Sequence, residues 1–117
     1  MFLQEITDEN GGLIPVAIAK QFHVSIEVIA TLVDLKIDNL KTDDLIQSET
    51  TQMRLRERVK IIEHVIPWCK NTTQAYEWYR HESLTSFNDL TAMALINQGK
   101  TDALVQYLER IDKGGFS

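Results

Sequence analysis

The stretch TQMRLRERVKIIEHVIPWC, residues 51–69, predicts a long helix and, with it, an α-helical fold. Its apolar side chains recur at alternating steps of four and three residues: Leu55, Val59, Ile62, Ile66 and Cys69. Such a stripe is typical of a helix that packs one face against a partner surface. Pro67 lies within the stripe and should kink the last turn or end the helix at Ile66, because proline lacks a backbone N–H.

The first half of this stretch is basic, and we expect its basic residues on the outer face of the helix. They are Arg54, Arg56, Arg58 and Lys60. Two interpretations are open. A run of this kind is common on a solvated helix face, and it is also the electrostatic footprint that a DNA-binding protein needs.

The preceding chain predicts a small helix-turn-helix unit over residues 13–50, after a flexible arm over residues 1–12. Pro15 suits the first turn of a helix, where its missing N–H is not needed. Ser25 can cap a second helix, because its hydroxyl accepts a free N–H of the first turn. Two short helices joined by about four residues form a helix-turn-helix pattern. Such a unit either binds DNA or serves packing and dimerisation.

Residues 51–117 predict a compact bundle of about four helices, so the expected fold class is all-α. Side-chain oxygens at three positions should cap its later helices: Asn71 (or Thr72), Asn88 and Thr101. Gly99 and Gly114 should each end a helix. The last helix carries a stripe of apolar residues that we expect to be buried: Leu104, Val105, Leu108 and Ile111.

The bulk composition fits one small globular protein of 117 residues. The net charge of -5 argues against wholesale nonspecific binding of nucleic acid. Cys69 is the only cysteine, so no disulfide can form within the chain. The first residues, MFLQEITDEN, lack the basic start and apolar core of a signal peptide, and we expect a cytoplasmic protein.

No pattern of catalytic residues stands out, so we expect neither an enzyme nor a cofactor or metal. His23, His64 and His81 are far apart and form no metal-ligand spacing. Cys69 lies on an apolar stripe, where a free cysteine usually packs as a small hydrophobe. The glycine pairs lack the flanking strand of a phosphate-binding loop.

The helix-turn-helix unit offers few contacts to DNA. The second helix of such a unit enters the major groove, and here it begins with Ser25 and Glu27. Glu27 would repel the phosphate backbone unless it accepted a hydrogen bond from cytosine. The residues available for DNA binding are therefore Ser25, Glu27, Arg54, Arg56 and Arg58.

The segment AYEWYRHESLTSFNDLTAMALINQGKTDALVQYLERIDKGGFS, Ala75–Ser117, resembles the toxin-binding domain of the Xre/MbcA/ParS antitoxin family. The resemblance lies in an alanine and a tryptophan on one helix (Ala75 and Trp78), a short loop, a helix of the TPLELL kind and a glycine break at Gly99. A last helix of the pattern L-x-R-I-x-x-G follows, here Leu108 to Gly114. The chain departs from the family by having Asn88-Asp89 in place of Thr-Pro.

The resemblance implies an antitoxin of a bacterial type II toxin–antitoxin pair. The expected partner is a RES-type toxin, which consumes NAD or uses it for ADP-ribosylation. The family also implies a homodimer whose helix-turn-helix represses the shared operon by binding operator DNA. The alternatives are a stand-alone helix-turn-helix regulator of transcription and a relative that acts as an adaptor between proteins.

The end of the chain is the expected toxin-binding site: Tyr107, Arg110, Gly114, Gly115, Phe116 and Ser117. The last helix would present Tyr107 and Arg110, with Glu109 beside them, and the tail would enter the active-site cleft of the toxin. Two alternatives are open. Phe116 can instead pack back on Ile111 or Leu108, and Arg110 can form a salt bridge within its own helix.

Overall fold

The computed structural model describes residues 5–9 and 11–114, and this part of the chain is all-α, as predicted. The described helices are α2 (Pro15–Phe22), α3 (Ile26–Leu32), α4 (Asp43–Ile46), α5 (Glu49–Val65), α6 (Thr72–His81), α7 (Ala92–Asn97) and α8 (Thr101–Gly114). Short 3-10 turns are η1 (Ile37–Leu40), η2 (Ile66–Trp68) and η3 (Thr85–Phe87). None of these helices is long and apolar enough to cross a membrane.

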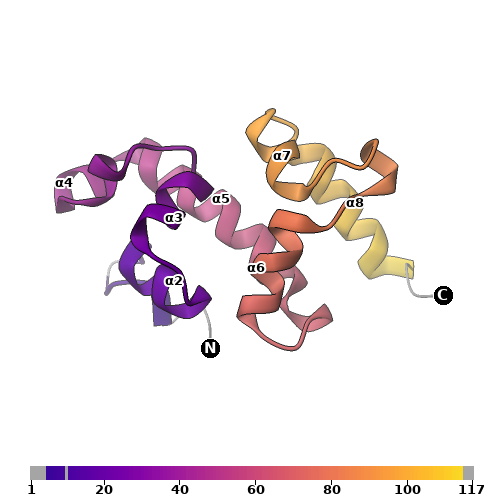
Figure 1. Cartoon of the computed structure of the whole chain (residues 1–117), viewed down its shortest axis with the longest axis horizontal. Helices are drawn as coiled ribbons and strands as arrows, with labels where there is room; N and C mark the ends of the chain where they lie inside the picture. Colours follow the sequence, from indigo (N-terminus) through magenta and orange to yellow (C-terminus); the bar gives the residue numbers. More distant parts are fainter. Residues whose placement is uncertain (1–4, 10, 115–117) are drawn as a thin grey trace.

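Helix α5 is the axis of the molecule. Figure 1 shows α2, α3 and α4 on one side of it and α7 and α8 toward the other end, with α6 between them. The hydroxyl of Ser48 caps α5 by accepting from the Thr51 N–H at 3.2 Å. The helix ends at Val65, and Pro67 lies in the η2 turn that follows. The predicted break near Ile66 is therefore confirmed.

The buried face of α5 is wider than the predicted stripe. Leu55, Val59 and Ile62 are buried as expected, but Ile61 and Val65 are buried as well. Residues of α2 and α3 belong to the same hydrophobic core as residues of α6, α7 and α8. Other helices cover α5 on more than one side, so residues outside the predicted stripe are buried as well.

The pair α2–α3 forms as predicted. Pro15 is at the start of α2, and Ser25 Oγ accepts from the Val28 N–H at 3.4 Å. His23 makes the turn between the two helices at φ 59° and is exposed. The Phe22 ring stacks on the Tyr76 ring of α6, with the ring centroids 5.0 Å apart. The α2–α3 pair is therefore packed against a helix that follows it in the chain.

Residues 1–12 were predicted to form a flexible arm, but the residues of this segment that the structure describes, 5–9 and 11–12, pack against the rest of the protein. Ile6 is fully buried, and its carbonyl accepts from the Ile14 N–H at 2.8 Å. Gln52 of α5 binds both backbone groups of Leu13, with its Oε1 at 2.9 Å from the N–H and its Nε2 at 3.0 Å from the carbonyl. Residues 5–9 and 11–12 are thus part of the packed structure.

Asn88 does not cap a helix, contrary to the prediction. Asn88 and Asp89 have φ of 58° and 66°, the left-handed region that Asn and Asp tolerate better than other residues do. They close a compact loop in which Leu84 and Leu90 form an isolated bridge. The helix begins only after this reversal, at α7, where Thr91 Oγ1 accepts from the Ala94 N–H at 3.1 Å.

Helix α7 ends at a glycine, as predicted. Gly99 has φ 79°, and the Lys100 N–H reaches back to the Leu95 carbonyl at 2.9 Å. This bond, with that from Gly99 to Ile96, is the glycine-terminated helix end known as a Schellman motif. Helix α8 then begins with Thr101 as its first residue, and the Thr101 hydroxyl donates to Glu57 Oε2 at 2.8 Å.

Candidate protein-binding surface

Helix α8 divides into a buried and an exposed side. Leu104 and Leu108 are fully buried, whereas Glu109 and Arg110 are exposed. Tyr107 lies between the two sides and is half-buried, with its ring edge-on to Phe87 at 5.5 Å between centroids. The side chain of Arg110 therefore points outward, as predicted, whereas the Tyr107 side chain also packs against Phe87.

Of the other predicted toxin-binding residues, Gly114 is the last described residue and lies within α8. Gly115, Phe116 and Ser117 lie outside the described residues. The predicted entry of this tail into a toxin cleft stays a prediction.

The two tryptophans of the chain come together beside α8. Trp68 is the last residue of the η2 turn, which contains Pro67, and its ring packs edge-on against His64 of α5 with 5.6 Å between the ring centroids. Trp78 is on α6 between residues that anchor this helix, Ala75 and Tyr79, which are both fully buried. Both indole side chains are half-buried.

Two adjoining hollows surround these tryptophans. One, of about 300 Å³, extends from Trp68 and Trp78 to Tyr107 and Ile111 of α8. The other, of about 370 Å³, extends along α6 past Glu77 and His81. Both hollows are lined by Trp68, Trp78 and Glu82, and we call the two together the tryptophan groove. An aromatic groove next to an exposed helix face is typical of a site that binds protein.

The charged residues of the tryptophan groove are mainly acidic. Glu77 lies 3.9 Å from Arg80 Nη1 and 3.1 Å from His81 Nε2. Glu82 is exposed and has no ion pair within the described part of the chain. Cys69 lies at the edge of the groove, and partial burial raises the pKa of its thiol, which disfavours the reactive thiolate.

The sequence pointed to Trp78 through the family resemblance but did not single out Trp68 or Glu82. The spacing of Trp78 and Glu82 could have indicated the site. They are four residues apart, so Glu82, which directly follows α6, lies on the same side of this helix as Trp78. Trp68 joins them only because η2 turns the chain back along α6.

The prediction that Arg58 lies on a basic outer face of α5 is wrong, because this side chain is buried. This side chain is 5 % exposed, and its guanidinium donates to the Leu32 carbonyl at 3.2 Å and to Asn97 Oδ1 at 3.1 Å. It also pairs with Glu57 at 2.6 Å. Arg58 is thus a buried link between α3, α5 and α7, and it is not placed to contact a phosphate.

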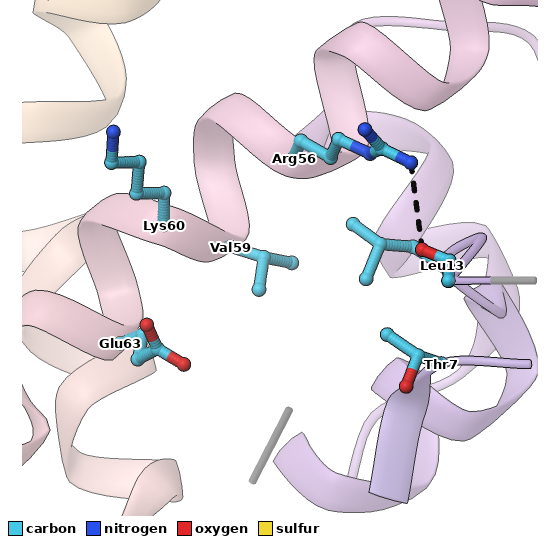
Figure 2. A pocket seen from close by; sticks show the side chains of 7 residues that line it. Thr7, Leu13, Arg56, Val59, Lys60 and Glu63 are labelled. Carbon is cyan, nitrogen blue, oxygen red and sulfur yellow. Dashed lines mark hydrogen bonds between the residues drawn. The ribbon is translucent and has the colours of Figure 1, made fainter. Parts of the chain in front are cut away.

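Arg54 and Arg56 also bind backbone carbonyls. Arg54 Nη1 donates to the Asp34 carbonyl at 2.6 Å, just beyond the end of α3. Arg56 Nη2 donates to the Gly11 carbonyl at 3.4 Å, a contact drawn in Figure 2. The C-terminal end of a helix carries partial negative charge, which favours guanidinium groups there. These arginines therefore hold the end of α3 and the segment before α2.

Ser25 and Glu27, the other predicted DNA-binding residues, are exposed at the start of α3. They lie at the opposite end of this helix from Arg54 and Arg58. The Ser25 hydroxyl already accepts the capping bond from Val28. The structure therefore does not gather the five predicted residues into one patch.

Another hollow, of about 400 Å³, lies between α5 and the segment before α2. Figure 2 shows Leu13, Thr7 and Val59 around it, with Lys60 directed away. Among the described residues, no group of His, Cys, Asp and Glu side chains is arranged to hold a metal ion.

Compared with protein-family models, with curated proteins and with solved structures, the chain matches none of them.

Proposed function

We propose that this protein is an antitoxin that binds and neutralises a RES-type toxin, one that consumes NAD or uses it for ADP-ribosylation. It acts by binding in the cytoplasm and not by catalysis. The observation that carries the proposal is the two-sided α8, which is anchored through Leu104 and Leu108 and presents Arg110 outward. The resemblance of Ala75–Ser117 to toxin-binding domains supplies the class of partner.

An anchored helix suits this task. Its exposed side chains are held in position before binding, so less conformational entropy is lost when a partner orders them. Arginine and aromatic side chains contribute more than their share of binding energy at protein interfaces. In the proposed complex α8 covers the active-site cleft of the toxin, and the residues after Gly114 enter it.

Operator binding, which the resemblance also implies, receives less support. Arg54 and Arg58 are engaged with the end of α3, and the start of α3 carries an acidic residue, Glu27. A DNA-binding protein needs cationic groups that are free to neutralise phosphates. In our proposal the α2–α3 pair therefore contributes mainly to packing, and homodimer formation would bring two α8 surfaces into one assembly.

The test is co-expression with a RES-type toxin encoded next to this protein. We expect the full chain to restore growth, and a form truncated after Lys113 or an Arg110→Glu variant to restore it poorly. The Arg56→Glu variant, altered on an exposed residue of α5, is the matched control and should protect as the full chain does.

Full protection by both the truncated form and Arg110→Glu would contradict the proposed role of α8 and the tail. Absence of any complex with the toxin, together with selective binding to the promoter, would favour a regulator of transcription instead. Absence of both would favour an adaptor.

A further inference from the structure

We infer that the tryptophan groove receives an arginine or lysine side chain of the toxin, held between the Trp78 ring and the Glu82 carboxylate. This inference concerns the partner of the proposed function and so rests on that proposal. It adds a contact away from the tail and states the chemistry that the partner must bring.

The first argument is the charge of the groove. Neither of its two hollows is lined by a lysine or arginine of the described chain, and both are lined by Glu82. Glu77, the other acidic lining residue, already contacts Arg80 and His81. Glu82 has no such neighbour among the described residues and is exposed. The groove therefore has one negative charge available for an incoming cation.

The second argument is the position of the aromatic ring. Glu82 directly follows α6, and its backbone N–H donates to the Trp78 carbonyl at 3.0 Å. Residues at this spacing lie on the same side of a helix. Trp78 is half-buried and borders both hollows, so its indole is accessible from the groove. Tryptophan is the aromatic residue that attracts a cation most strongly over its face.

The third argument is the apolar remainder of the groove. Tyr107 and Ile111 of α8 complete the hollow beside Trp78. The long aliphatic stem of arginine or lysine buries well on such a surface while its charged end stays at a polar edge. A cationic side chain next to an apolar one would match both the acidic edge and the aromatic floor.

The experiment measures the affinity of the purified toxin for variants of this groove by calorimetry. We expect Glu82→Gln to weaken binding about 5- to 10-fold and Glu82→Lys clearly more, with a smaller difference at high salt. Trp78→Phe keeps an aromatic ring and should weaken binding about 3-fold. The control is Asp44→Asn, an exposed acid on α4 at the far end of the molecule, which should bind as the parent chain does. Unchanged affinity for both Glu82 variants would overturn the inference.

A second measurement separates this inference from the proposed function. The full chain is titrated with acetyl-Leu-Arg-amide and with acetyl-Leu-norleucine-amide while the Trp78 indole N–H is followed by NMR. A shift that appears with about 1–10 mM arginine peptide, that the norleucine peptide does not cause and that Glu82→Gln reduces would support the groove chemistry. This would hold even if the toxin itself did not bind.

Equal shifts with the two peptides, or none with either, would overturn the inference. A third result would also overturn the inference. In it, the Trp78 resonance shifts when residues 115–117 are removed, but neither the full chain nor the shortened chain responds to the arginine peptide. In that case the groove would belong to the end of this chain and not to a partner.

Discussion

At the scale of single residues, Arg58 shows how far tertiary contacts change the meaning of a charged side chain. In the sequence it is one of several basic residues on a polar helix. In the structure it is buried and bonded to three groups on α3, α5 and α7: the Leu32 carbonyl, Glu57 and Asn97. A buried guanidinium is tolerated only when its donors are satisfied in this way.

We therefore predict that Arg58→Met lowers the free energy of unfolding by about 1–3 kcal/mol, because it leaves the buried Leu32 carbonyl without its donor and removes the ion-pair partner of Glu57. Urea denaturation followed by circular dichroism measures this change. Arg56→Met is the matched control, since Arg56 is exposed and makes one long hydrogen bond. Equal, small effects of the two substitutions would contradict the structural role of Arg58.

Tyr79 is a second residue whose state depends on burial. Its side chain is fully buried, and desolvation raises the pKa of its hydroxyl far above the ordinary value, an effect that the nearby Arg58 reduces. The hydroxyl has no well-aligned hydrogen-bond partner in the described structure. The folded state thus holds the phenol proton more tightly than the unfolded chain does.

The sign of the pH dependence follows from this difference. The contribution of Tyr79 to stability is fully present below the ordinary tyrosine pKa of about 10 and decreases as the pH rises above it. We predict that the free energy of unfolding falls above pH 10, and that Tyr79→Phe reduces this fall while changing stability at pH 7 by less than about 1 kcal/mol. Denaturant titrations at pH 7 and in the alkaline range test both parts. A larger loss at pH 7 would show that the hydroxyl makes a stabilising bond.

At the scale of elements, the start of each helix depends on which polar residue occupies the N-cap position, where its side chain can accept a free N–H of the first turn. Ser25, Ser48 and Asn71 cap their helices, and the residue types alone made Ser25 and Asn71 good candidates. Before α7 the chain offers both Asn88 and Thr91. The loop from Leu84 to Leu90 uses Asn88 for a left-handed turn, so the cap is left to Thr91.

We predict that Thr91→Ala lowers the free energy of unfolding by about 1 kcal/mol, the usual effect of losing an N-cap. Asn88→Gly should be tolerated, because glycine adopts the left-handed conformation without strain. Thermal or urea unfolding measures both, with Thr85→Ala, an exposed neighbour in η3, as the control. If Asn88→Gly destabilised the protein more than Thr91→Ala does, the cap would instead lie at Asn88.

At the scale of the whole molecule, one hydrophobic core crosses the boundary that sequence patterns suggested near residue 50. Buried residues from Ile6 to Leu108 belong to this core, and the Phe22–Tyr76 stack and the bond from Thr72 to the Gln21 carbonyl join its two parts. The division into residues 13–50 and 51–117 therefore describes the order of the elements along the chain. It does not separate two hydrophobic cores.

The candidate surface was only partly predictable for the same reason. The exposed position of Arg110 follows from helical spacing, because Leu104, Leu108 and Ile111 define the opposite side of α8. The tryptophan groove does not follow from spacing. It requires α8 to meet η2 and α6, which lie much earlier in the sequence.

Local sequence by itself determined which segments become helices, where Pro67 and Gly99 end them, and which stripes are buried, since these properties depend on side chains within a few residues of each other. Only the tertiary structure decided where the arginines of α5 point and which aromatic side chains share a groove. Those outcomes depend on neighbours from distant parts of the chain, whose carbonyls, rings and excluded volume select among conformations that are locally equivalent.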